Sequence, residues 1–192
     1  MEEEDLIEEA RITPQGFARI VDRYYDLILN YIYKRTLDRD LSFDLTQQTF
    51  LKAFLNLEKF RKNREIPYSH YLLKLATNEV NMYLRKRKET LGIDPDIWAR
   101  FSSFEKDSEE NETRELIYRA LEKLSPRHQS VIFLRYFQEL SPREVARVLG
   151  VSEVACRVIT HRALQKLKKE IEAMERETGI GKSSEHHGTE QP

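Results

Sequence analysis

The sequence predicts an all-α fold, with two small helical domains joined by an acidic linker. Glycine is absent from Phe17 to Leu91 and again from Ile93 to Leu149, and both spans are rich in Leu, Lys, Glu and Arg. Long spans of this composition favour helices, and we find no alternating strand pattern of useful length in the chain. Charged residues make up 34% of the chain and its mean hydropathy is −0.66. Two compact helical units therefore fit better than one large core.

The net charge of −1 hides an uneven distribution of charge. Acidic residues dominate 2–9 and 94–112, whereas basic residues dominate 61–90. Two basic helical regions separated by an acidic one suit a protein that contacts a polyanion twice, through a linker that does not bind it. We therefore divide the chain into an acidic, only partly ordered N-terminal segment (1–12), a first domain (13–89), the linker (90–112), a second domain (113–172) and a disordered tail (173–192).

The first domain opens with two predicted helices. Thr13-Pro14 is a helix start, and apolar residues then recur at helical spacing from Phe17 to Ile32. The periodicity lapses at 37–40, and Ser42 or Asp44 can open the next helix, which we expect to reach Phe60. Its predicted buried stripe consists of Leu45, Phe50, Ala53, Phe54 and Leu57.

A third helix is predicted from Tyr68 to Lys88, directly after Pro67. Leu72, Ala76, Val80 and Leu84 recur every four residues and form its inner face. A second face carries an aromatic ring (Tyr71), two cations (Lys74 and Arg85), an amide (Asn78) and the side chain of Met82. These groups are the ones that hold single-stranded nucleic acid. A solvated charged face is the alternative if the helix is taken by itself.

The acidic linker contains isolated aromatic residues. Trp98 and Phe101 are candidates to anchor the linker on a neighbouring surface.

One cysteine, Cys156, excludes an internal disulfide and fits a reducing compartment, where we expect it to be a buried structural thiol. The chain shows no signal peptide and no apolar run of about 20 residues, so we expect a cytoplasmic protein without membrane insertion.

The second domain contains a predicted helix-turn-helix. After a helix start at Ser125-Pro126, the segment Ser141-Pro142-Arg143-Glu144 has the form of a capping box, and Gly150 suits an abrupt turn. Ser152 then caps a longer basic helix, which in this motif enters the DNA major groove. An ordinary helical hairpin with a solvated basic face is the alternative.

The faces of this basic helix follow from its spacing. Its predicted core stripe consists of Cys156, Thr160, Ala163, Leu167 and Ile171, and its predicted DNA side of Ser152, Glu153, Arg157, His161 and Arg162. Arg157 can pair with a guanine edge and Glu153 can accept from cytosine. Two interpretations stay open for Val154, Val158 and Ile159: they touch thymine methyl groups, or they pack on a neighbouring helix.

Several segments resemble one known family. DLTQQTFLKAF at 44–54 resembles the segment of bacterial sigma factors that docks on the clamp of core RNA polymerase. The run YLLKLATN at 71–78, followed by YLRKR at 83–87, resembles the sigma segment that melts and reads the promoter −10 element. LSPRHQSVIFLRYF at 124–137 and SPREVARVLGVS at 141–152 resemble the domain for the −35 element. The order and the short linker are similar to the two-domain, extracytoplasmic-function (ECF) type of the sigma-70 family.

This resemblance implies site residues and partners. Core polymerase would be bound by Asp44, Leu45, Gln47, Gln48 and Leu51. The −10 strand would be held by Arg61, Lys62, Arg64, Tyr68, Tyr71, Lys74, Asn78, Tyr83, Arg85 and Lys86. The partners implied are core RNA polymerase, promoter DNA (duplex at −35, single-stranded at −10) and an anti-sigma factor. We predict no catalytic residue, metal or cofactor, because no paired nucleophile and no Gly-rich phosphate loop is present.

Two other functions remain possible at this point. A free-standing helix-turn-helix regulator would bind duplex DNA without polymerase, typically as a dimer on a symmetric site. A helical adaptor would use its basic faces to meet an acidic protein and would show no salt-dependent DNA binding.

Overall fold

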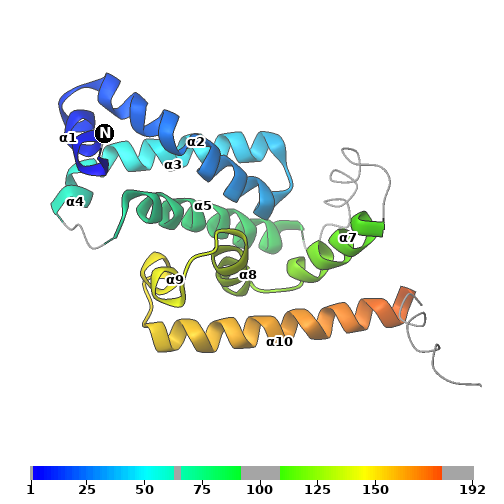
Figure 1. Ribbon diagram of the computed structural model, residues 1–192. Coiled ribbons are helices and arrows are strands. Elements are labelled where there is room, and N and C mark those ends of the chain that lie inside the picture. Colours follow the sequence, from blue (N-terminus) through cyan, green and yellow to red (C-terminus); the bar gives the residue numbers. More distant parts are fainter. Residues whose placement is uncertain (1, 63–65, 92–108, 179–192) are drawn as a thin grey trace, which may run out of the picture.

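The computed structural model describes residues 2–62, 66–91 and 109–178 (Figure 1). Within these ranges the chain is helical and contains no strand, as the sequence predicts. The helices are α1 (Glu3–Ile12), α2 (Pro14–Thr36), α3 (Arg39–Leu55), α4 (Leu57–Lys62), α5 (Tyr68–Leu91), α7 (Glu109–Glu122), α8 (Pro126–Ile132), the π-helix η1 (Phe133–Phe137), α9 (Pro142–Leu149) and α10 (Glu153–Thr178). We call α1–α5 the first domain and α7–α10 the second.

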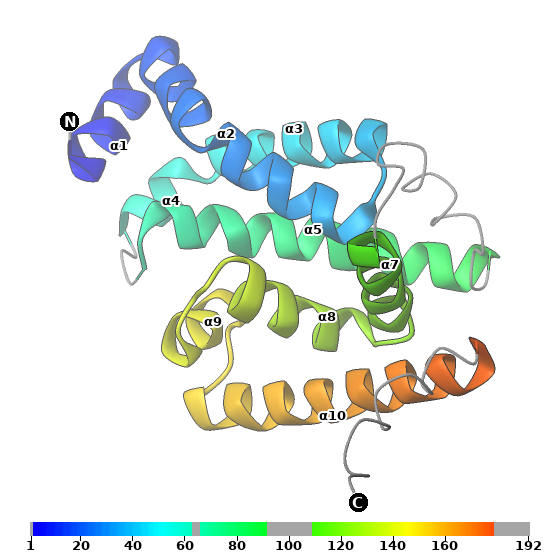
Figure 2. The same cartoon turned by 45° about the vertical axis from the view of Figure 1, so that its right-hand side comes forward.

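Helix α5 runs through the middle of the molecule. Helices α2 and α3 pack on one side of it, and α8 and α9 pack on the other (Figures 1 and 2). The long helix α10 lies beyond α8 and α9 and packs against α7, α8 and α9. The two domains therefore meet along α5.

The N-terminal segment is a helix rather than a partly ordered stretch, so this expectation was wrong. Leu6, Ile7 and Ala10 are buried against α2, because they recur at helical spacing on one face of α1. The two helices approach so closely that a Cβ added at Gly16 would lie 2.3 Å from the carbonyl oxygen of Glu9. The helix was not predicted because its apolar stripe is short and most of the residues around it are acidic.

The second and third helices begin and end close to the predicted positions. Helix α3 starts at Arg39 rather than at 42–44, because the Asp38 carboxylate accepts a hydrogen bond from the Leu41 N–H at 3.0 Å and caps it. The predicted helix from Asp44 to Phe60 is divided at Asn56 into α3 and α4. Helix α5 begins at Tyr68, as predicted from Pro67.

The caps of the second domain confirm the predictions. Ser125 accepts a hydrogen bond from the His128 N–H at 3.3 Å, and Ser141 and Glu144 form the predicted capping box. Gly150 has φ 66°, in the left-handed region that a glycine adopts without strain. The π-helix at Phe133–Phe137 was not predicted. It brings the rings of Phe133 and Phe137 into a stack, with centroids 4.6 Å apart.

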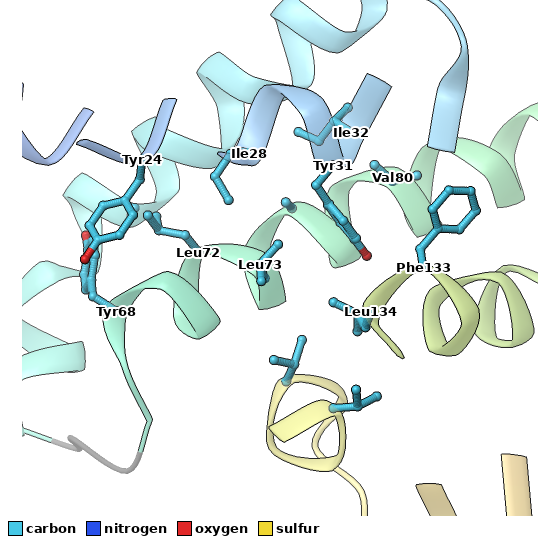
Figure 3. Packing of buried hydrophobic residues seen from close by; sticks show 14 of the residues in the cluster. Tyr24, Ile28, Tyr31, Ile32, Tyr68, Leu72, Leu73, Val80, Phe133 and Leu134 are labelled. Carbon is cyan, nitrogen blue, oxygen red and sulfur yellow. The ribbon is translucent and has the colours of Figure 1, made fainter. Parts of the chain in front are cut away.

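A continuous apolar core joins the two domains. Figure 3 shows Phe133 and Leu134 of the second domain beside Tyr31, Leu73 and Val80 of the first, and all five side chains are buried. Polar contacts lie at the edge of this core. The Arg35 guanidinium donates to Asn81 Oδ1 at 2.8 Å and to the carbonyl oxygen of Pro126 at 3.5 Å.

Several predicted features concern residues beyond the described ranges. Trp98 and Phe101 of the linker, Arg64 of the basic segment 61–67 that precedes α5, and residues 179–192 of the tail lie outside them. Helix α10 continues to Thr178, so it extends past residue 172, where the predicted tail begins. Helix α7 begins at Glu109, inside the predicted linker.

Candidate nucleic-acid and protein interfaces

The N-terminus of α10 is set by its local sequence. The Ser152 hydroxyl accepts a hydrogen bond from the Ala155 N–H at 3.1 Å, and so caps the helix. The preceding turn is closed by the Val151 N–H, which donates to the carbonyl oxygen of Ala146 at 2.9 Å. Helices α9 and α10 thus form the predicted helix-turn-helix, with Ser152 and Val154 exposed at the start of α10.

The two faces of α10 are clearly separated. Cys156 and Ala163 are fully buried against the rest of the domain, and Thr160, Leu167 and Ile171 are partly buried, as the core stripe predicts. Burial raises the pKa of the Cys156 thiol, consistent with a structural role. Val154 and Val158 lie on the opposite face and are 73% and 44% exposed, whereas Ile159 is partly buried and packs against the core, as the second interpretation predicts for it.

The polar residues predicted for the DNA side are accessible. Arg157, His161 and Arg162 are exposed, and Glu153 is partly exposed. Arg157 Nη2 donates to Glu153 Oε1 at 2.7 Å, one turn earlier on the helix. Arg157 and Glu153, the two side chains predicted to contact base edges, therefore form an ion pair with each other in the free protein.

Cations from α8 and α10 gather beside this face. Lys166, Arg127 and Arg162 are exposed. The pKa of His128 is lowered, first by burial of its ring and then by the positive charges of Lys166, Arg127 and Arg162. The start of α8 and the middle of α10 thus form one basic surface, suited to phosphate groups.

The predicted nucleic-acid face of α5 is also exposed. Lys74, Asn78, Met82 and Arg85 share one solvent-accessible face, followed by exposed Lys86. The acidic residue within this stretch, Glu79, points inward and accepts from Lys52 at 2.6 Å. Its charge therefore does not offset the cations of the exposed face.

Of the predicted −10 residues, the tyrosines are less accessible than the cations. Tyr71 and Tyr83 are partly buried. Tyr68 is fully buried, with its ring 4.9 Å from the ring of Phe60, and burial raises the pKa of its hydroxyl well above its ordinary range. The prediction that Tyr68 contacts DNA therefore does not fit this arrangement, because its side chain belongs to the core. Arg61 and Lys62 end helix α4.

The entrance of α5 is held by α1. The Glu3 carboxylate accepts from the Tyr68 backbone N–H at 2.9 Å and from the Tyr24 hydroxyl at 3.0 Å. Burial and the charge of Glu3 raise the pKa of Tyr24 to about 12. This contact was not found from the sequence, because Glu3 looks like any other residue of an acidic run.

The predicted polymerase surface on α3 is partly corrected. Asp44, Gln47, Gln48 and Leu51 are exposed, at the spacing of one helical face. Leu45 is buried at 4% exposure, so its side chain does not reach a partner in this arrangement. Phe54, predicted to be buried, is 48% exposed, and Leu55 is 70% exposed. Phe54 and Leu55 add apolar side chains to this exposed face. In the sequence, the i, i+4 spacing of Leu51 and Leu55 indicates that these two residues share one face of the helix.

Comparison with known proteins identifies two family regions. The Sigma-70 region 2 model matches residues 20–90, and the Sigma-70 region 4 model matches residues 114–167. These correspond to α2–α5 and to α7–α10. No helix in the described ranges is both long enough and apolar enough to cross a membrane.

Individual proteins agree with these matches. The chain is 34% identical to the RNA polymerase sigma factor YlaC of Bacillus subtilis, over 77% of this chain and 87% of that protein. It is 27% identical to the ECF RNA polymerase sigma factor SigW of the same organism, over 81% of this chain and 89% of that protein. The structure of CnrH in complex with the cytosolic domain of CnrY shares the fold, with a TM-score of 0.61 and 21% identity over 88% of this chain and 95% of that chain. The chain thus belongs to the sigma-70 family of RNA polymerase sigma factors and is of the extracytoplasmic-function type.

Proposed function

We propose that this sigma factor directs core RNA polymerase to promoters by binding the −35 element as duplex through α10 and the melted −10 strand through α5. The observation that carries the proposal is the pair of exposed faces, one on each domain, that hold cations beside groups able to contact bases. On α5 these are Lys74, Asn78 and Arg85, and on α10 they are Arg157 and His161.

The mechanism is recognition and strand capture, without covalent chemistry. Cations on α5 attract the phosphates of a separated strand, and Asn78 offers an amide to a base edge. Tyr71 and Tyr83 become available for stacking only if their rings turn out of the partly buried positions that they occupy here. Helix α10 lies in the major groove, with the basic surface around His128 on the flanking phosphates.

Polymerase and regulatory partners fit other surfaces. The exposed α3 face, with Asp44, Gln47, Gln48 and Leu51, is proposed to dock on the polymerase clamp, extended by Leu55. An anti-sigma factor is proposed as the inhibitor of this chain. In this structure the second domain covers the side of α5 that carries Leu73 and Asn81, while Lys74 and Asn78 stay exposed. The contact between the two domains therefore does not mask the strand-binding face, and a separate inhibitor would have to cover it.

Run-off transcription with purified core polymerase on a pool of promoter fragments tests the proposal. We expect promoter-specific transcripts that depend on this chain and vanish with Lys74→Ala plus Arg85→Ala. The control, Lys123→Ala plus Arg176→Ala, removes the same charge from exposed positions away from the α5 face and should transcribe normally. Duplex binding without polymerase and without transcripts would favour a free-standing regulator. Neither transcripts nor salt-dependent DNA binding would favour a protein adaptor.

A further inference from the structure

Two valines occupy the face of α10 that points directly away from its own domain. Each residue of a helix turns by about 100°, so Val154 and Val158 lie roughly opposite Cys156, which is fully buried. His161 and Gln165 continue the same exposed stripe toward the C-terminus. The stripe therefore begins with apolar side chains in the first turns of the helix, the part that reaches base edges in this motif.

Single exposed apolar residues are common on protein surfaces and need no explanation by themselves. These two differ in their surroundings. They are exposed neighbours one turn apart, with Arg157 and Arg162 beside them on the same helix and Lys166 further along. Two apolar side chains surrounded by cations complement a polyanion that exposes apolar groups between its phosphates. The DNA major groove has this property where it is rich in thymine, because thymine presents a methyl group there.

One of the polar neighbours already has a partner in the free protein. Arg157 is held by Glu153 at 2.7 Å, so pairing with a guanine would require that contact to be given up. Val154 and Val158 need no such rearrangement. The 5-methyl group of thymine is the apolar feature that a base pair presents in the major groove, so it is the partner that a valine can distinguish.

We infer that Val154 and Val158 contact thymine 5-methyl groups in the −35 duplex and so set the base preference of this sigma factor. The inference rests on the proposed function and specifies which bases of the duplex α10 recognises. The two side chains are about 6 Å apart along the helix axis, so each can reach a different base. The preferred element should therefore carry one thymine within reach of each valine.

The test uses the complex of the full chain with core polymerase on a promoter found by run-off transcription. Each −35 thymine is replaced in turn by deoxyuridine, which removes the methyl group and leaves the hydrogen-bonding pattern unchanged. Loss of one buried methyl should weaken binding about three- to fivefold at one or two positions and leave the others unaffected. Val154→Ala and Val158→Ala should each weaken binding similarly and abolish the response at one position only.

Leu164→Ala is the matched control, because Leu164 is an exposed apolar residue of the same helix at 38% exposure and lies off this stripe. It should leave the deoxyuridine response intact. Promoter binding that is indifferent to every deoxyuridine would overturn the inference and leave the proposed function standing. A Val154→Ala variant that loses polymerase, while the methyl response persists, would assign the valines to a protein contact and also overturn it. Absence of specific promoter binding would remove both the inference and the proposed function.

Discussion

Ser130 of α8 and Asn81 of α5 lie with their side-chain oxygens 3.1 Å apart, so a hydrogen bond crosses between the two domains. Asn81 also accepts from Arg35 of α2 at 2.8 Å. The helix that carries the proposed strand-binding face is therefore tied on its other side to both domains. The arrangement of the domains in this structure depends on buried polar groups as well as on apolar packing.

Arg35→Ala should loosen this contact. Arg35 is only 6% exposed and donates to Tyr31, Asn81 and the carbonyl oxygen of Pro126. Removing a buried, hydrogen-bonded side chain should lower the free energy of unfolding by about 2–4 kcal/mol. Urea denaturation of the full chain measures this. The control Arg19→Ala breaks an exposed ion pair with Glu9 and should cost at most about 1 kcal/mol. Equal effects of the two variants would contradict a structural role for Arg35.

Gly16→Ala should detach α1. The added Cβ would lie 2.3 Å from the carbonyl of Glu9, so the two helices would have to separate, at a cost of about 1–3 kcal/mol. Hydrogen exchange should show lost protection in α1, with α5 unchanged beyond its first turn, where Glu3 caps Tyr68. Gln15→Ala, at the exposed neighbouring position, is the control. Unchanged protection of α1 would show that the contact between α1 and α2 tolerates a methyl group.

Sequence patterns predicted best where local chemistry decides the structure. The capping box at Ser141 and Glu144, the left-handed Gly150 and the Ser152 cap each depend on a few neighbouring residues, and each is observed. The exposed face of Lys74, Asn78 and Arg85 follows from helical spacing alone.

Contacts between distant residues could not be predicted in this way. The resemblance assigns Tyr68 to DNA and Leu45 to polymerase, yet both side chains are buried. A sequence motif does not distinguish residues that contact a partner from residues that pack in the core. The hydrogen bond from the Tyr68 N–H to Glu3 joins residues 65 positions apart, and nothing in the local pattern marks it. The meeting of the two domains through Asn81 and Ser130 is of the same kind.

The pKa of His128 should report duplex binding. In the free protein it is lowered from 6.5 by burial and by Lys166, Arg127 and Arg162. The pKa of His128 is lower in the folded protein than in the unfolded chain. The neutral ring therefore contributes to folding stability above about pH 6.5, and this contribution is lost as the pH falls through the pKa of the folded protein. Phosphates would offset the three cations, so duplex binding should raise the pKa and become stronger as the pH falls.

An NMR titration of the histidine ring protons measures this, with His128→Gln to assign the signal. Lys166→Ala should raise the pKa of His128 in the free protein, because it removes one of the charges that lower it. An identical pKa with and without a −35 duplex would show that the start of α8 does not face DNA.

Leu51→Ala plus Leu55→Ala should weaken the association with core polymerase while leaving the fold intact. The two side chains are 58% and 70% exposed, so their truncation creates no cavity and the thermal midpoint should stay within a few degrees of the unmodified chain. Burial of two leucine side chains in an interface removes apolar surface from water, so the loss of both should cost at least about tenfold in Kd. Competition against a labelled copy of the unmodified chain for core polymerase measures the loss. Ile117→Ala, at an exposed apolar position of α7, should compete normally. Normal competition by the double variant would move the polymerase contact away from this end of α3, since Leu51 and Leu55 lie on the same face as Asp44, Gln47 and Gln48.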